Sequence, residues 1–100
     1  MKRRAARVDA NQAAIVEALR SIGCSVLSLA SQGNGCPDIL VAKPSMGTMN
    51  LLMEIKDGKK PPSARKLSDD ELKFHGSWLG PIAVVDSVDS ALRAVIAYTR

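Results

Sequence analysis

The sequence predicts an α/β domain with a mixed central sheet flanked by helices, in the element order αβββαβα. Two observations support this prediction. Short apolar runs of strand length alternate with segments in which apolar residues recur at helical spacing. Hydrophobic residues make up 46% of the chain, and its 100 residues suit one domain over 1–100 with a modest core.

The first helix is predicted over 10–22. Asp9 precedes it as a candidate N-cap, and Gly23 follows it as a candidate C-cap. Ahead of the helix, residues 1–7 are expected to form a flexible basic arm. The helix carries an apolar stripe that should face the core, made of Ala14, Ile15, Ala18, Leu19 and Ile22.

Three strands are predicted next, over 24–29, 38–43 and 50–56. A polar, glycine-rich loop over 31–36 separates the first two strands. Residues 44–48 join the second and third strands as a hairpin.

The second half of the chain begins with a loop over 59–66, since two consecutive prolines prevent one regular element throughout it. Ser68 and Glu71 have the spacing of a capping box, and they begin a helix that ends near Trp78. A buried strand is predicted over residues 82–85. Ser87 then caps a last helix, whose expected core face is Val88, Leu92, Val95 and Ile96.

Asp38, Glu54 and Lys56 form the most informative constellation. Asp38 opens one predicted strand, and Glu54 lies near the end of the next. Side chains alternate between the two faces of a strand, so Glu54 and Lys56 point the same way. Two carboxylates suit a hard divalent cation, and a lysine can stabilise the charge that builds on a scissile phosphate. The alternatives are a turn aspartate and an ion pair on an edge strand.

These residues resemble the motifs of the PD-(D/E)XK nuclease superfamily, and more narrowly the small stand-alone VRR-NUC domains of phages and prophages. The similarity covers residues 9–12, 35–38, 54–56 and 67–78. It implies a restriction-endonuclease-like core and a metal-dependent DNA endonuclease similar to Holliday-junction resolvases. Such relatives cleave branched DNA and usually form homodimers, and the implied location is the cytoplasm of a bacterial host.

The resemblance also implies roles for particular residues. Asp38, Glu54 and the backbone carbonyl of Ile55 would hold Mg²⁺ or Mn²⁺, with Lys56 as a catalytic residue beside them. Asp38 and Glu54 are then catalytic residues as well as metal ligands.

Other candidates rest on weaker parallels. Gln12 lies near the place where resolvases carry a glutamate, and we expect it to belong to the catalytic site. Glu17 is the alternative acid, although we interpret it as a solvated charge. Ser31 is expected near the phosphate, with simple loop polarity as an equal alternative. Glu71 occupies a place where many relatives have a glutamine, but the capping box explains it. His75 reads as a packed or surface residue.

The net charge of +4 favours a polyanionic partner. Cations gather in the N-terminal arm and in the segment that follows Lys56. The alternative is a solvated tail and a solvated loop. The candidate contacts to the DNA backbone are Lys59, Lys60, Arg65, Lys66, Arg3, Arg4 and Arg7.

Composition argues against several other classes of protein. No apolar run approaches the roughly 18 residues of a membrane span, and the basic N-terminus lacks the apolar stretch of a signal peptide. Cys24 and Cys36 make no disulfide framework, and His75 is the only histidine, so we expect no zinc site.

Two alternatives to an independent nuclease remain open. One is a non-catalytic DNA-binding module that uses the same basic surface. The other is a nuclease subunit that acts beside a phage helicase or recombination protein. The carboxylates favour a nuclease over a simple binding module, because a binder needs no carboxylates near phosphate.

Overall fold

The structure of the protein, a computed structural model, describes residues 10–99. The Asp9 cap and the basic arm with Arg3, Arg4 and Arg7 lie outside this range. Within it, every helix is too short or too polar to cross a membrane.

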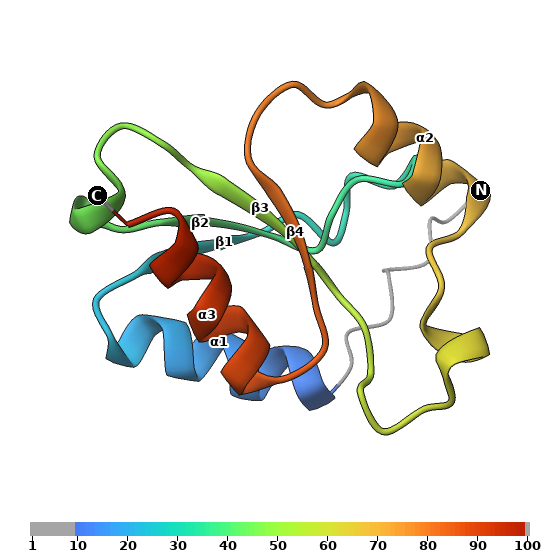
Figure 1. The fold of residues 1–100 in the computed structure, drawn as a ribbon, viewed down its shortest axis with the longest axis horizontal. Helices are drawn as coiled ribbons and strands as arrows, with labels where there is room; N and C mark the ends of the chain where they lie inside the picture. The colour runs from blue at the N-terminus through green and yellow to red at the C-terminus, as the bar shows by residue number, and fades with distance from the viewer. Residues whose placement is uncertain (1–9, 100) are drawn as a thin grey trace.

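Three α-helices and four strands build the described part of the domain (Figure 1). Short 3₁₀ helices occupy Pro44–Met46 and Pro62–Arg65, inside segments expected to be irregular. In chain order the elements are α1 (Ala10–Ser21), β1 (Ser25–Ser28), β2 (Ile39–Ala42), β3 (Leu51–Ile55), α2 (Asp69–Ser77), β4 (Ile82–Val85) and α3 (Val88–Ala97).

The four strands form one mixed sheet in the order β1-β2-β3-β4. β1, β2 and β3 are antiparallel neighbours, and β4 lies parallel to β3. β3 has a neighbour on each side, and all five of its residues are buried. The predicted α/β class and the mixed sheet with flanking helices are therefore confirmed.

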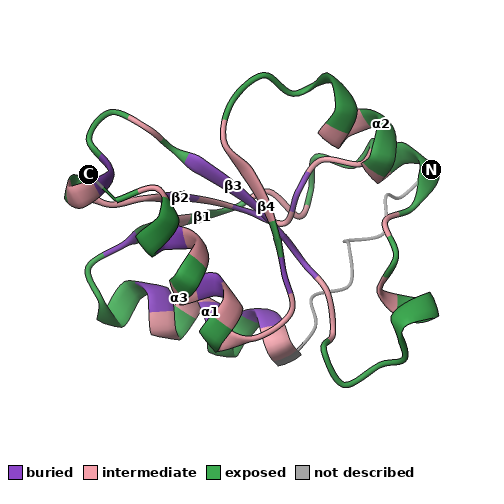
Figure 2. Cartoon of the chain, viewed as in Figure 1, coloured by how far each residue is buried: buried purple, intermediate pink, exposed green. Residues whose placement is uncertain are grey.

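Helices α1 and α3 pack together on one face of the sheet. The core lies between them and the strands, as the buried segments in Figure 2 indicate. Ile15 and Leu19 of α1 meet Met53 and Ile55 of β3 in this core, together with Val95 of α3.

Four sequence expectations about burial are wrong. Ala14 of α1 is exposed rather than turned toward the core. Ile22 follows the end of α1 and is 39% exposed, because the turn carries it away from the helical stripe. Ile96 is 68% exposed, since the stripe of α3 runs through Ala91 and Val95, and the next residue points about 100° away. The last strand is not buried throughout: Val84 is 49% exposed, and only Val85 is fully buried.

The opposite face of the sheet is only partly covered. Leu27 of β1 and Val84 of β4 are large exposed residues on this face. Figure 1 shows α2 beyond one end of the sheet, away from α1 and α3. This placement brings α2 to the end at which β2 begins and β3 ends, where Asp38 and Glu54 lie.

Candidate active site

Asp38 lies one residue before β2 and faces the end of β3. Its backbone N–H donates to the carbonyl of Met53 at 3.0 Å, and its Oδ2 accepts from the N–H of Ile55 at 2.6 Å. The carboxylate thus takes the place of the next partner in the ladder between β2 and β3. Because hydrogen-bonding groups alternate along a strand, the carbonyls of Met53 and Ile55 point to the same side, toward Asp38.

Glu54 is buried beside Asp38, with only 3% of its surface exposed. Among the described residues, its Oε1 has no hydrogen-bond partner. Burial raises the pKa of Glu54 to about 9, and the neighbouring carboxylates of Asp38 and Glu71 add to this effect. The Lys56 ammonium opposes it. A buried carboxyl group with an unpartnered oxygen is costly and would gain from a cation.

Lys56 extends from the same face of β3 and lies between two glutamates. Its Nζ donates to Oε1 of Glu71 at 2.7 Å and lies 3.9 Å from Oε2 of Glu54. Three carboxyl groups and one ammonium therefore meet here: Asp38, Glu54, Glu71 and Lys56.

Glu71 has two roles, of which the sequence revealed only one. It completes the expected capping box of α2, since its Oε1 accepts from the N–H of Ser68 at 2.8 Å. The same oxygen binds Lys56. Burial alone would raise the pKa of Glu71, but the bonds from Lys56 and Ser68 hold this pKa below its ordinary value. Glu71 is therefore the charged partner of Lys56.

A direct backbone contact holds α2 over the site. Gly35, in the loop before Asp38, packs against the first turn of α2, and its φ is +78°. A Cβ at Gly35 would lie 2.2 Å from the carbonyl oxygen of Asp70 and 2.8 Å from the N–H nitrogen of Glu71. Only a glycine allows the two backbones to come this close. The contact fixes the loop before Asp38 against α2, the helix that carries Glu71.

Cys36 borders the same carboxylates. Burial raises the pKa of its thiol, and the charges of Glu54 and Asp38 raise it further. Cys36 therefore presents a neutral thiol at the edge of the site, and both cysteines are free.

Two other candidates from the sequence form no hydrogen bond with this cluster among the described residues. Gln12 is buried on the face of α1 that also carries Ile15 and Leu19. Within residues 10–99 it forms no hydrogen bond or ion pair with the carboxylates. Ser31 is exposed in the loop between β1 and β2.

His75 is half-buried on α2, one turn after Glu71. Its Nε2 has no hydrogen-bond partner among the described residues. Within residues 10–99, no hydrogen bond or ion pair joins His75 to the carboxylates.

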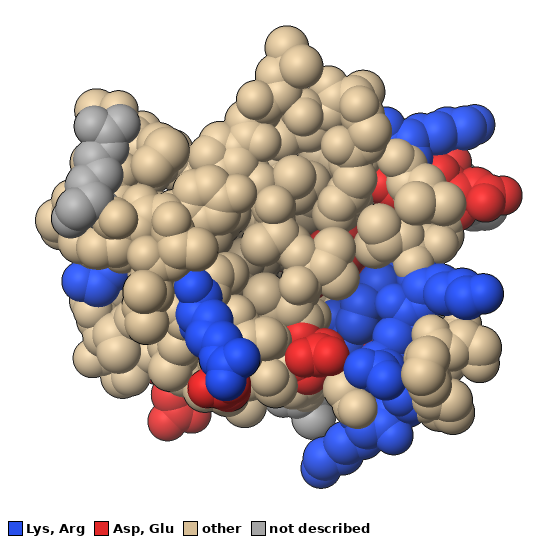
Figure 3. All heavy atoms as spheres, in the orientation of Figure 1, with Lys and Arg blue, Asp and Glu red and all other residues tan. Residues whose placement is uncertain are grey.

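The basic segment that follows β3 lies beside the site. Lys59, Lys60 and Lys66 are exposed and make no ion pair with any described residue. Arg65 instead binds Asp86, with its Nη1 at 3.2 Å from Oδ2. Figure 3 shows Lys and Arg side chains gathered at the lower right of this view, where the segment lies in Figure 1.

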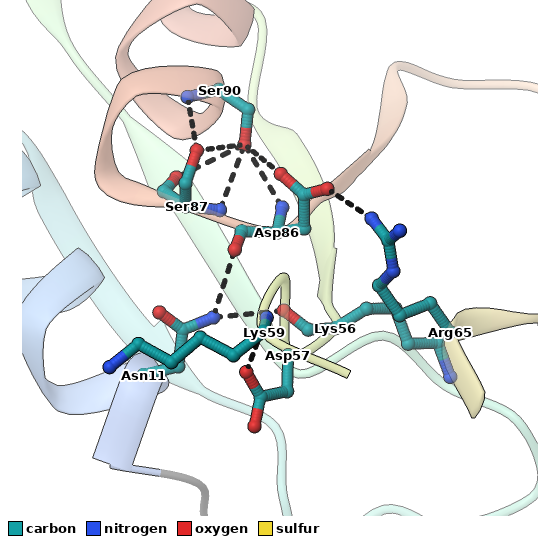
Figure 4. A network of polar contacts seen from close by, with 8 residues as sticks. All are labelled: Asn11, Lys56, Asp57, Lys59, Arg65, Asp86, Ser87 and Ser90. Atoms are coloured by element: carbon teal, nitrogen blue, oxygen red, sulfur yellow. Dashed lines mark hydrogen bonds and ion pairs between the residues drawn. The ribbon is translucent and has the colours of Figure 1, made fainter. Parts of the chain in front are cut away.

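Sequence reasoning did not foresee the bonds that Asn11 forms. Its side-chain amide donates to the backbone carbonyls of Lys56 at 2.8 Å and Asp86 at 3.2 Å (Figure 4). Its sequence neighbour Gln12 was the expected site residue in α1. No local pattern identifies Asn11, because both acceptors are distant backbone groups.

The donor set fits a hard cation better than a soft one. In the described part of the chain, no three side chains of His, Cys, Asp and Glu are grouped so that they could hold a metal ion unaided. The two carboxylates Asp38 and Glu54 would need oxygen from the chain or from water, such as the Ile55 carbonyl. Mg²⁺ commonly binds through one or two carboxylates and keeps several waters.

Comparisons with protein-family models, curated proteins and solved structures gave no match.

Proposed function

We propose that this protein is a metal-dependent endodeoxyribonuclease that hydrolyses phosphodiester bonds in branched DNA. The observation that carries the proposal is the buried Glu54 carboxyl group between Asp38 and Lys56, one oxygen of which has no partner among residues 10–99. A structural ion pair explains Lys56 and Glu71, but it gives no reason to bury a second carboxylate beside Asp38.

The proposal includes a PD-(D/E)XK fold of the VRR-NUC type. Its support is the three-stranded antiparallel meander β1–β3 followed by the parallel β4, with an acidic residue before β2 and the Glu54-Ile55-Lys56 motif at the end of β3. The resemblance stated above implies such an arrangement, so these features support the proposal.

Asp38, Glu54 and the backbone carbonyl of Ile55 would hold Mg²⁺ or Mn²⁺. When bound, the ion polarises the scissile phosphate and lowers the pKa of a nearby water. Glu54 must release its proton to bind a cation, and Asp38 is already fixed in place by the N–H of Ile55. The chain thus supplies one pre-oriented carboxylate and one that becomes charged on metal binding.

Lys56 acts as a positive charge rather than as a base in this proposal. Its Nζ is held by a 2.7 Å hydrogen bond to the charged Glu71. An ammonium held at the rim of the site stabilises the negative charge that develops on the phosphate. Glu71 acts through Lys56 and is a positioning residue.

The substrate is inferred from charge and size. Exposed Lys59, Lys60 and Lys66 continue from the site strand and suit a phosphate backbone on either side of the scissile bond. One protomer has one site, so cleavage of two strands of a junction needs a C₂ homodimer. A phage helicase or recombination protein is the further partner in this proposal.

A cleavage assay tests the function directly. Four-way junction, flap and linear duplex DNA are incubated with the protein in Mg²⁺, in Mn²⁺ and in EDTA. We expect cleavage of branched DNA with either metal and none in EDTA. Asp38→Asn should abolish cleavage, whereas Asp89→Asn, an exposed aspartate on α3, should not. DNA binding without cleavage under all conditions would favour the non-catalytic module instead.

A further inference from the structure

The end of the site strand is held by a small network that the catalytic residues do not explain. The amide nitrogen of Asn11 lies between the backbone carbonyls of Lys56 and Asp86 and donates to both (Figure 4). We call Asn11, Lys56 and Asp86 the strand-end clasp. It joins the first turn of α1 to the ends of β3 and β4.

The clasp acts where the backbone ladder stops. The N–H of Lys56 donates to the carbonyl of Val85 at 2.8 Å, and the two parallel strands separate after this bond. The carbonyls of Lys56 and Asp86 then need other donors. A carboxamide NH₂ group has two hydrogens and can serve both at once, which a hydroxyl group or a single N–H cannot.

Asp86 is a firm anchor for this clasp. Its Oδ1 accepts from the Ser90 hydroxyl at 3.2 Å, its N–H donates to the same hydroxyl at 2.9 Å, and its Oδ2 binds Arg65. A Cβ at Gly58 would lie 2.6 Å from its carbonyl oxygen. The chain on both sides of Asp86 therefore has little conformational freedom. Because Asn11 binds both carbonyls, it restrains the backbone of Lys56 against this rigid segment.

We propose that Asn11 is a positioning residue for Lys56. The amide fixes the backbone of Lys56 from the helix side of the sheet, while the ammonium reaches Glu71 and Glu54 on the other face. The inference rests on the proposed nuclease function. Small displacements of a catalytic group can lower turnover up to about 100-fold, so a loosened strand end should act on kcat.

The test uses Asn11→Leu, which keeps the size of the side chain and removes both donors, and the smaller Asn11→Ala. Asn50→Leu is the matched control, because Asn50 is exposed immediately before the other end of β3. Val95→Ala, a core substitution in α3, serves as a control for lost stability alone. Measurements are kcat and KM for junction cleavage, melting temperature, and hydrogen exchange at the Lys56 amide.

We expect both Asn11 variants to lose about 10- to 100-fold in kcat with little change in KM. The Lys56 amide should exchange faster in them than in Asn50→Leu or Val95→Ala. The proposal would be overturned if the Asn11 variants lost no more kcat than Val95→Ala. It would also be overturned if their KM rose while kcat stayed unchanged. Unchanged exchange at Lys56 would also overturn it, whether or not the protein cleaves DNA. If the parent protein cleaves no DNA but the Lys56 amide exchanges faster in the Asn11 variants, the nuclease function is rejected and the clasp is retained.

Discussion

Lys56 Nζ lies 2.7 Å from Oε1 of Glu71, although Glu54, two residues away on the same strand face, is 3.9 Å distant. The ammonium is therefore oriented mainly by a residue of α2 rather than by its own strand. Glu54 has one oxygen without a partner in the part of the chain that the structure describes, so it is left available for another cation.

Lys56→Ala should retain DNA binding and lose turnover by about two orders of magnitude, as for the removal of one transition-state donor. Single-turnover cleavage and binding to uncleaved junction DNA separate the two effects. An unchanged rate with weaker binding would make Lys56 a simple phosphate contact.

Glu71→Gln should separate the two roles of this side chain. A glutamine can still complete the capping box, so the free energy of unfolding should change little. The loss of the charged partner should lower kcat by about tenfold. Glu71→Ala should lower kcat similarly and also lose about 1 kcal/mol of stability with the cap hydrogen bond. Equal stability of the two variants would contradict this assignment.

Glu54 should make the metal-free protein less stable as the pH rises. Its pKa is about 9 in the folded protein, against an ordinary value of 4.5. Between these values the folded protein holds a proton that the unfolded chain has released, so the free energy of unfolding falls with increasing pH. Glu54→Gln should flatten this dependence, and its denaturation midpoint should exceed that of the parent near pH 8 in EDTA.

The check is denaturant unfolding at several pH values between about 5 and 9, with and without Mg²⁺. Magnesium binding must displace the Glu54 proton, so its stabilising effect should grow with pH. A parent protein whose metal-free stability is flat or rising over this range would contradict the buried neutral Glu54.

Gly35→Ala should damage both the fold and the site, because the new methyl group meets the Asp70 carbonyl and the φ of +78° disfavours alanine. We expect a loss of more than about 2 kcal/mol in the free energy of unfolding and a large loss of cleavage. Gly76→Ala is the matched control. Gly76 lies in α2 with open space around it, so this change should stabilise the protein by about 0.5–1 kcal/mol. Equal effects of both substitutions would contradict the packing of the loop on α2.

Neutralising Lys59, Lys60 and Lys66 together should weaken DNA binding without changing metal binding. Each lost phosphate contact should lower the slope of log affinity against log salt by about 0.9 on duplex DNA. A salt titration in the Asp38→Asn background keeps the DNA intact. Arg65 stays unchanged, because it holds Asp86.

The control for this experiment neutralises three cations elsewhere: Arg20, Lys43 and Arg93. The net charge changes equally in both triple variants, so a difference between them reports contacts rather than total charge. The same loss of slope in both would place the DNA surface elsewhere, with the basic N-terminal arm as the next candidate.

Local patterns in the sequence predicted most of the elements. The capping box at Ser68 forms as expected, and Ile15 and Leu19 face the core, because caps and helical stripes depend on nearby residues. Ile96 shows the limit of this reasoning. An apolar residue beside a helical stripe is assigned to it by periodicity, yet the neighbouring elements decide where the stripe ends.

The same holds for the candidate site: contacts set by local patterns were predicted, and contacts set by distant elements were not. Asp38, Glu54 and Lys56 stand at the ends of adjacent strands, so the hairpin alone suggests that they meet. The pairing of Glu71 with Lys56 depends on where α2 lies after a long connection. The bonds of Asn11 involve backbone carbonyls, which carry no residue-specific signal. These contacts needed the three-dimensional structure.

The bonds of Asn11 also have a consequence for how the protein is made. They join residues separated by 45 and 75 positions in the chain. Contacts of such length form late, because the entropy of closing long loops must be overcome first. During synthesis, α1 emerges early but cannot engage Asp86 until that residue has left the ribosome. A nascent or truncated chain that ends before Asp86 would therefore hold Asp38, Glu54 and Lys56 without the Asn11–Asp86 bond, and cleavage should appear only after Asp86 has joined α1.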